Sequence, residues 1–142
     1  MTQLSYTRGP QDNPLRYSWG ELAEVVEDCA RGLLALGLLP GDRVGIWAPN
    51  CAEWCIAQFA MAKVGAILVN INPAYRLSEL EYVLKQSGCR WLICAEQFKS
   101  SDYHAMLAEL IPELADSPPG GLHATRLADL RGVISMGRTP TA

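Results

Sequence analysis

Apolar and polar positions along the chain alternate in blocks that predict helices joined to short strands. Residues 50–76, NCAEWCIAQFAMAKVGAILVNINPAYR, show this pattern most completely. We expect Asn50 to cap a helix there and Gly65 to end it in a left-handed conformation. Helical spacing puts several apolar side chains on one face, with a further group widening the stripe. The first group is Trp54, Ala57, Met61 and Val64, and the second is Cys55, Phe59 and Ala62.

An uninterrupted apolar run, AILV at residues 66–69, follows that helix. A run without alternation is typical of a strand covered on both faces. Asn70, Asn72 and Pro73 are expected to stop the strand. In an open α/β sheet, ligands bind beyond the carboxyl ends of the strands. The loop after residue 69 is therefore a candidate ligand edge.

The same alternation continues along the rest of the chain. Ser18 with Glu21, and Ser78 with Glu81, match the S-x-x-E capping box that begins a helix. Pro112 is expected to kink or end the helix that contains it. The remaining expected elements are helices over 18–36, 78–87 and 101–115 and strands over 43–47, 90–95 and 133–136. Strands that alternate with helices predict an α/β fold, here a partial doubly wound, mainly parallel sheet with helices on both faces.

Turn-forming and polar residues divide the chain into three parts. Residues 1–15 are rich in Gly, Pro, Asp and Asn and are expected to form an N-terminal arm. Residues 16–136 form the predicted α/β domain. Residues 137–142 carry no large apolar side chain and are expected to fray.

Composition narrows the classes of function. The chain has 142 residues, 49% of them hydrophobic, and a net charge of −3. It is long enough to bury a core, and scattered Lys and Arg give no footprint for nucleic acid. No apolar run is long enough to span a membrane, and the N-terminus lacks the apolar segment of a secretory signal. Five cysteines suit a reducing compartment. We therefore predict the cytoplasm, with the mitochondrial matrix as the alternative.

Phosphate-binding glycine loops are missing from the places where an α/β sheet carries them. The loop after the first strand reads APN, the loop after the second reads NINP, and no Walker lysine motif occurs. Glycines let a backbone wrap a pyrophosphate, so a dinucleotide or P-loop site within these residues is disfavoured. This also disfavours a nucleotide-dependent oxidoreductase, one of the alternatives.

Cysteines and histidines offer no clear reactive centre. Cys51 and Cys55 are four residues apart on one predicted helix, but no second Cys/His pair has zinc-like spacing and Trp54 between them favours packing. We expect core thiols and no metal site. His104 and His123 have no nucleophile-elbow sequence nearby, so exposed surface histidines are expected and no catalytic residue is assigned.

Tyr75 and Arg76, after Asn72 and Pro73, are the most promising polar group. They follow the strand at its carboxyl end, where a ligand could bind. The alternative is a loop whose asparagines and proline only make the turn into the next helix. Both interpretations remain open at this point.

Three separated segments resemble the N-terminal part of the adenylate-forming synthetases. They are YSWGEL (17–22), GLLALGLLPGDRVGIWAPNCAEW (32–54) and AKVGAILVNINPAYRLSELEYVL (62–84). The resemblance covers about residues 15–136 and is strongest to the medium-chain fatty-acyl-CoA ligase branch that includes acyl-CoA synthetase family member two.

The resemblance implies a two-step reaction. ATP and a fatty acid form an acyl-adenylate with release of pyrophosphate, and the thiol of coenzyme A then displaces AMP. The parent enzyme would use ATP, Mg²⁺ and coenzyme A, and none of them is expected to bind this chain tightly. The loop after the matching strand approaches the thiol tunnel in some relatives, which implies a contact for Asn72, Pro73 and Tyr75.

The family's phosphate loop and lid lysine do not occur in the 142 residues. The helix and hairpin that normally precede a YSWGEL-type motif are also missing. We therefore expect a fragment or truncated product that is inactive alone. An unpaired, apolar sheet edge would favour self-association. The alternative from another class is a non-catalytic α/β module that binds a partner or a small acyl ligand.

Overall fold

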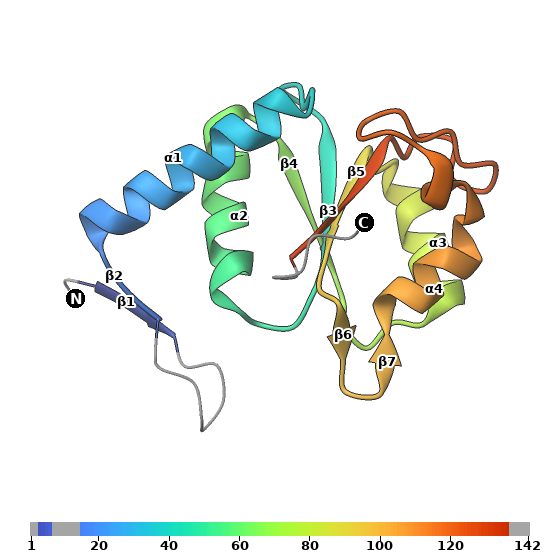
Figure 1. Cartoon of the computed structure of the whole chain (residues 1–142), viewed down its shortest axis with the longest axis horizontal. Coiled ribbons are helices and arrows are strands. Elements are labelled where there is room, and N and C mark those ends of the chain that lie inside the picture. The colour runs from blue at the N-terminus through green and yellow to red at the C-terminus, as the bar shows by residue number, and fades with distance from the viewer. Residues whose placement is uncertain (1–2, 7–14, 137–142) are drawn as a thin grey trace.

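A four-stranded parallel sheet organises the computed structural model, which describes residues 3–6 and 15–136 (Figure 1). β3 pairs with β4 in the register Arg43 to Ile67, and with β5 in the register Val44 to Trp91. The order across the sheet is β4-β3-β5-β8. The strands are β3 (Arg43–Trp47), β4 (Ile67–Ile71), β5 (Trp91–Cys94) and β8 (Gly132–Ser135).

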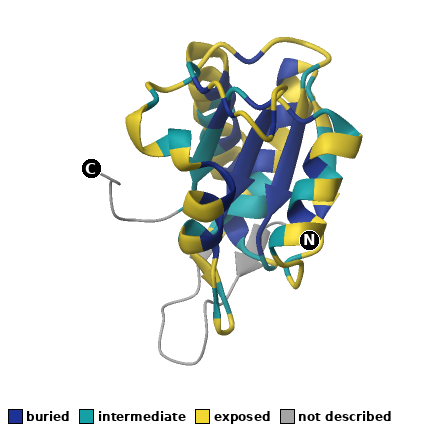
Figure 2. Ribbon diagram, turned by 90° about the vertical axis from the view of Figure 1, so that its right-hand side faces the viewer, coloured by how far each residue is buried: buried dark blue, intermediate teal, exposed yellow. Residues whose placement is uncertain are grey.

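Helices cover both faces of this sheet. One face packs against α1 (Trp19–Ala35) and α2 (Ala52–Val64), and the other against α3 (Leu77–Ser87) and α4 (Tyr103–Leu110). Figure 2 shows the buried strands between helices whose outer surfaces are exposed. The predicted α/β class, a doubly wound parallel sheet with helices on both faces, is confirmed.

Alternating side chains along the strands feed two hydrophobic clusters. On β3, Ile46 joins the cluster under α1 and α2, whereas Trp47 joins the cluster under α3 and α4. On β5, Ile93 and Leu92 divide in the same way. Successive residues of a strand point to opposite faces, so one short strand can anchor both layers of helices.

The start of α1 follows the prediction. Glu21 N donates to Ser18 Oγ at 3.2 Å, and Ser18 N donates to Glu21 Oε2 at 2.7 Å. This reciprocal capping box satisfies two backbone donors that the first turn leaves unpaired. Gly37, with φ of 95°, follows the end of the helix.

The start and outer face of α2 differ from the prediction. Cys51 occupies the N-cap, so the prediction that Asn50 caps this helix is wrong by one position. Phe59, which is 47% exposed, and Ala62 lie outside the buried stripe. The inner side of α2 packs against α1 and the sheet, and its outer side faces solvent. Gly65 ends the helix with φ of 77°, as predicted.

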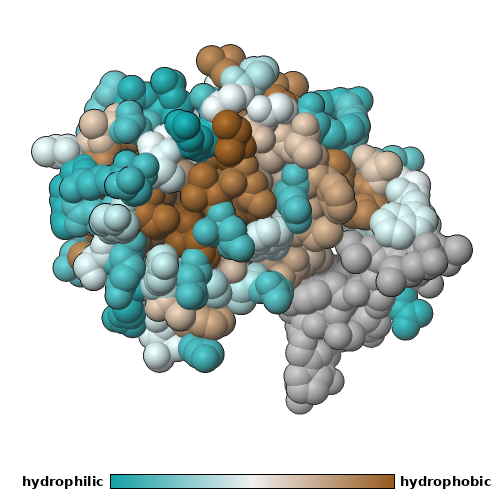
Figure 3. All heavy atoms as spheres, turned by 180° about the vertical axis from the view of Figure 1, so that it is seen from behind, coloured by the Kyte–Doolittle hydropathy of each residue, from teal (hydrophilic) through white to brown (hydrophobic). Residues whose placement is uncertain are grey.

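β4 is an edge strand, yet its side chains pack on both faces as predicted: Leu68 packs against the cluster under α1 and α2, and Val69 and Ile71 pack in the cluster under α3 and α4. Among the described residues it pairs with β3 alone, and Ile67 is 48% exposed. Pairing also continues through Asn70 to Ile71, so Asn70 does not stop the strand. Seen from behind, the side on which β4 lies, the molecule carries an apolar patch near its middle (Figure 3). The order of the strands places the apolar residues 67–69 at the edge of the sheet.

α3 begins two residues earlier than predicted. Its N-cap is Arg76, whose backbone N–H donates to Glu79 Oε2 at 3.2 Å. The predicted pairing of Ser78 with Glu81 is therefore wrong. Glu81 instead forms ion pairs with Lys85, one turn further on, and with a distant arginine. Gly88 ends α3 with φ of 65°, as its position predicts.

The segment between β5 and β8 is less helical than predicted. A short hairpin, β6 (Gln97–Phe98) and β7 (Ser101–Asp102), precedes α4. The helix ends at Leu110, and a 3₁₀ helix, η1 (Pro112–Asp116), follows. Proline lacks the backbone donor that an α-helix needs, so the predicted early end is confirmed.

The N-terminal arm contains a strand. β1 (Gln3–Tyr6), within the predicted N-terminal arm, pairs antiparallel with β2 (Leu15–Ser18). The predicted fraying of residues 137–142 falls outside the described residues, and the predicted domain boundaries stay predictions. No described helix is both long enough and apolar enough to cross a membrane.

Candidate functional site

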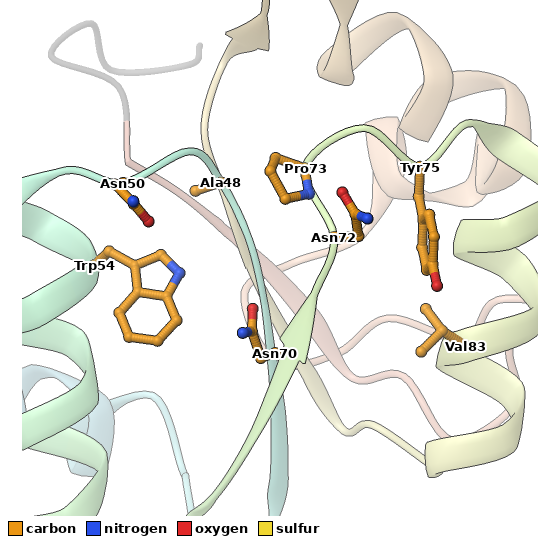
Figure 4. Close-up of a pocket in the computed structure, with 8 residues that line it drawn as sticks. All are labelled: Ala48, Asn50, Trp54, Asn70, Asn72, Pro73, Tyr75 and Val83. Atoms are coloured by element: carbon orange, nitrogen blue, oxygen red, sulfur yellow. The ribbon is translucent and has the colours of Figure 1, made fainter.

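A pocket of about 490 Å³ opens at the carboxyl end of β4 (Figure 4). Because parallel strands all end at the same edge of the sheet, the segments that follow β3 and β4 meet there. The three residues predicted from the sequence, Asn72, Pro73 and Tyr75, all line this pocket. The full lining is Ala48, Asn50, Trp54, Asn70, Asn72, Pro73, Tyr75 and Val83.

Asn72 shapes the loop from within. Its side-chain Oδ1 accepts a hydrogen bond from Ala74 N at 2.9 Å, and its carbonyl accepts one from Tyr75 N at 3.0 Å. These bonds make the tight turn that was predicted for a loop leading into the next helix. The same turn places Tyr75, which is 36% exposed, along the pocket wall. Turn formation and a contact with a ligand are therefore compatible at this loop.

Pro73 is anchored by a side chain from α4. The Tyr103 hydroxyl donates to the Pro73 carbonyl at 2.5 Å. The Tyr103 ring stacks on Trp47 of β3, with ring centroids 3.6 Å apart and an interplanar angle of 9°. Burial, aided by the nearby Cys94, raises the pKa of Tyr103 to about 12, so its hydroxyl stays protonated at neutral pH. Tyr103 was not singled out from the sequence.

The opposite wall carries side chains from α2 and β4. In Figure 4, Trp54 and Asn70 lie close to each other, with Asn50 above them and Tyr75 across the end of β4. Sequence reasoning missed Trp54 and Asn70 as pocket residues. Asn70 was the better signal, since a polar residue near the end of an apolar strand is typical of a site.

The lining is neutral. Carboxamides and aromatic rings supply its polar and planar groups, and none of the eight lining residues is an Asp, Glu, His, Lys or Arg. Such a surface can hydrogen-bond to amide or hydroxyl groups and pack against a thin chain. It offers neither a cation for phosphates nor a general base. The geometry therefore favours binding over proton transfer.

Arg76 does not line the pocket. Its Nη1 donates to Ser101 Oγ of β7 at 3.0 Å, so the guanidinium points away from the pocket and toward the hairpin. The sequence made Arg76 a candidate ligand contact, but its side chain instead makes a structural contact with the hairpin. Together with Tyr103, Arg76 ties the loop to the segment between β5 and α4.

The other candidate residues lie elsewhere. Cys51 and Cys55 are half-buried, and burial raises the pKa of Cys94 to about 12. Within the described ranges, no three His, Cys, Asp or Glu residues lie close enough to hold a metal ion. His104 is half-buried, with Nε2 3.2 Å from Ser135 Oγ, so the prediction of an exposed histidine is wrong there. His123 is exposed, as predicted.

The chain is similar to known proteins in both sequence and fold. The medium-chain acyl-CoA ligase ACSF2, mitochondrial, from Pongo abelii is 48% identical over 122 residues, which is 86% of this chain and 20% of that protein. The chain thus spans about a fifth of the length of this curated relative.

Solved structures of two synthetases contain a similar sheet. A fatty acyl CoA synthetase from Mycobacterium tuberculosis is 27% identical with a TM-score of 0.66, and 85% of this chain matches 21% of that chain. A long-chain-fatty-acid-CoA ligase (FadD1) from Archaeoglobus fulgidus gives a TM-score of 0.68 at 23% identity, over 96% of this chain and 24% of that chain. The profile of the AMP-binding enzymes matches residues 4–129. This chain therefore belongs to the family of AMP-binding enzymes.

Proposed function

We propose that the chain is the N-terminal part of an ATP-dependent ligase that joins a fatty acid to coenzyme A. The observation that carries this proposal is the 48% identity over 122 residues to a protein named as a medium-chain acyl-CoA ligase. In the proposed reaction, the fatty-acid carboxylate attacks the α-phosphorus of ATP and pyrophosphate leaves. The thiolate of coenzyme A then attacks the acyl carbon and AMP leaves. Mg²⁺ would spread the phosphate charge in the first step.

The chain by itself is proposed to be inactive in adenylation. Its sequence contains neither a glycine- and lysine-bearing phosphate loop nor the lid segment that the family resemblance implies. The pocket at β4 supplies no Lys or Arg that could stabilise a phosphate. ATP and Mg²⁺ therefore belong to the parent enzyme, and the described residues contribute the scaffold.

The pocket at β4 is proposed to contact the thiol-bearing arm of coenzyme A in the parent enzyme. That arm is a thin, neutral chain with two amide groups, and its chemistry matches a lining of carboxamides and aromatic rings. Asn72, Pro73 and Tyr75 form the wall nearest the loop. Asn50 and Asn70 offer amide partners on the other side (Figure 4).

A chimeric enzyme tests the proposed function. Residues 16–129 of this chain would replace the matching segment of a medium-chain acyl-CoA ligase, and acyl-CoA formation from ATP, coenzyme A and a fatty acid would be measured. We expect the chimera to form acyl-CoA, because the chain is 48% identical to a medium-chain acyl-CoA ligase over 122 residues. A chimera that folds and releases pyrophosphate but forms no thioester would contradict the assignment of the pocket to the thiol arm.

The purified 142-residue chain provides the complementary test. With a fatty acid, ATP and Mg²⁺ we expect no pyrophosphate release above background. Measurable release that depends on the fatty acid would overturn the proposed inactivity. The parent ligase, assayed in parallel, is the positive control.

A non-catalytic binding module is the second candidate. The neutral pocket favours it, because its residues can bind a small ligand without any catalytic group. This candidate predicts a monomer that binds an acyl or amide ligand in the absence of ATP. Calorimetry with and without ATP separates it from the ligase proposal.

We propose the cytoplasm as the compartment, with the mitochondrial matrix as the alternative. The five cysteines, which suit a reducing compartment, support the first. The relative from Pongo abelii is named as mitochondrial, which supports the second. Fractionation of cells that express the tagged parent protein distinguishes the two.

A further inference from the structure

The pocket wall formed by residues 72–75 is held by contacts from a segment about thirty residues further along the chain. Pro73 receives the Tyr103 hydroxyl, and the neighbouring Arg76 binds Ser101. Both partners belong to the junction of β7 and α4. The loop's own hydrogen bonds, from Ala74 and Tyr75 to Asn72, fix its turn but not its position against the sheet.

Tyr103 is itself fixed on several sides. Its side chain is 0% exposed and its ring lies flat against Trp47 on the central strand β3. Its backbone N–H donates to the Glu96 carbonyl at 3.1 Å. Asp102 caps α4 by accepting from Ala105 N at 3.0 Å, which sets the direction of the helix just where Tyr103 begins it. The hydroxyl therefore meets Pro73 from a rigid support.

The ring and the hydroxyl of Tyr103 make different contributions. The Tyr103 ring contributes buried apolar area and stacking to the core, whereas the hydroxyl makes its one hydrogen bond within the described residues to Pro73. Core packing alone would be served equally by phenylalanine. Carrying the hydroxyl into a fully buried position has a desolvation cost that this hydrogen bond offsets.

We propose that Tyr103 is a positioning residue whose hydroxyl holds the Asn72–Tyr75 wall of the pocket in place. Its relevance to the thiol arm of coenzyme A rests on the proposed function of the pocket, but the tie to the loop can be tested alone. Arg76 with Ser101 is a second, exposed tie, so its loss has a smaller effect.

Tyr103→Phe is the decisive variant, because it keeps the ring and removes the donor. Amide hydrogen exchange at Ala74 and Tyr75 of the full 142-residue chain is the first readout. We expect exchange there to accelerate about two- to tenfold, the range that one net hydrogen bond supports. Exchange at Leu84, in the middle of the core, should stay unchanged. Near-ultraviolet circular dichroism should retain the signature of the stacked Trp47.

Two controls separate a local from a global effect. Tyr82→Phe removes the hydroxyl of an exposed tyrosine on α3 and should leave loop exchange unchanged. Ser101→Ala removes the second tie and should raise loop exchange less than Tyr103→Phe does. Unchanged exchange at Ala74 and Tyr75 in Tyr103→Phe would overturn the proposal. An equal rise at Leu84 would also overturn it, since that marks general destabilisation.

Pantetheine, the amide-bearing thiol arm alone, is the probe for the pocket. Titration at millimolar concentration should shift the amide resonances of Ala74 and Tyr75 in the wild-type chain, and several-fold more ligand should be needed in Tyr103→Phe. If pantetheine shifts neither resonance in the wild type while Tyr103→Phe still loosens the loop, the proposed thiol contact fails and the positioning role stands. If both proteins bind pantetheine equally, the positioning role fails.

Discussion

β5 and β4 have similar apolar sequences, WLIC and ILVNI, but they occupy different places in the sheet. Every residue of β5 is buried, because β3 and β8 flank it and helices cover both its faces. β4 lies at the edge, where Ile67 and Asn70 are exposed. β5 ends at the buried Cys94, whereas the end of β4 opens into the pocket. The central strand thus supplies the core, and the edge strand supplies the candidate site.

The first prediction compares the two strands directly. Leu92→Ala on β5 should lower the free energy of unfolding by about 2–5 kcal/mol, because it leaves a cavity at a fully buried position. Ile67→Ala on β4 should lower it by less than about 1 kcal/mol, because that side chain is already 48% exposed. Urea denaturation measures both. Equal losses would mean that β4 is as well covered as β5.

The second prediction concerns the space between the strands. A Cβ at Gly45 of β3 would lie 2.8 Å from Ile71 Cδ1 and 3.2 Å from Leu92 Cδ1. Gly45→Ala should therefore destabilise the chain by about 1–3 kcal/mol through overpacking. Gly32→Ala in α1 is the control, since nothing lies within 4 Å of its Cβ position. That variant should stabilise the chain by about 0.5–1 kcal/mol, and thermal melting distinguishes the two signs.

Much of the fold could be predicted from local patterns. The capping box at Ser18 and the glycines that end α2 and α3 are readable because each meets a requirement of its own turn. The strands of the sheet are readable as apolar runs between helices. Strand order is a long-range property, so nothing in residues 66–69 indicates that β4 lies at the edge.

The site was predictable only in part. Tyr75 was identified because it follows a strand, the family resemblance added Asn72 and Pro73, and the structure brings all three into one pocket. Trp54 and Tyr103 were missed because their contacts come from packing of distant segments. The indole of Trp54 reads as one more apolar residue of a helical stripe, and a hydroxyl that reaches across thirty residues leaves no local signal.

The third prediction concerns the open edge of β4, where self-association was predicted from the sequence. Within the described ranges the outer edge of β4 pairs with no strand, and its five residues carry no charge or proline that would block pairing. Ile67→Lys should reduce any concentration-dependent rise in molar mass, measured by light scattering. Leu34→Lys, at a 52% exposed position on α1, should leave it unchanged. Equal effects of the two variants would indicate nonspecific solubilisation.

The last prediction tests a contact on the surface of α3, far from both strand centres. Glu81 accepts from Lys85 Nζ at 2.7 Å and from Arg126 Nε at 3.2 Å. The Lys85 bond first, then Arg126, lowers the pKa of this carboxyl below its ordinary 4.5. A lowered pKa in the folded state stabilises the chain above pH 4.5, and this contribution is lost as the pH falls through the folded value.

In Glu81→Gln the free energy of unfolding should therefore fall less between neutral and acidic pH than it does in the wild-type chain. At pH 7 the variant should be destabilised less than Leu92→Ala or Gly45→Ala. Exposed ion pairs contribute little because water and salt screen them. Glu24→Gln, at an exposed carboxyl of α1, is the matched control. Urea denaturation at several pH values compares the two variants. Identical pH profiles for both variants would show that Glu81 gains no stability from Lys85 and Arg126.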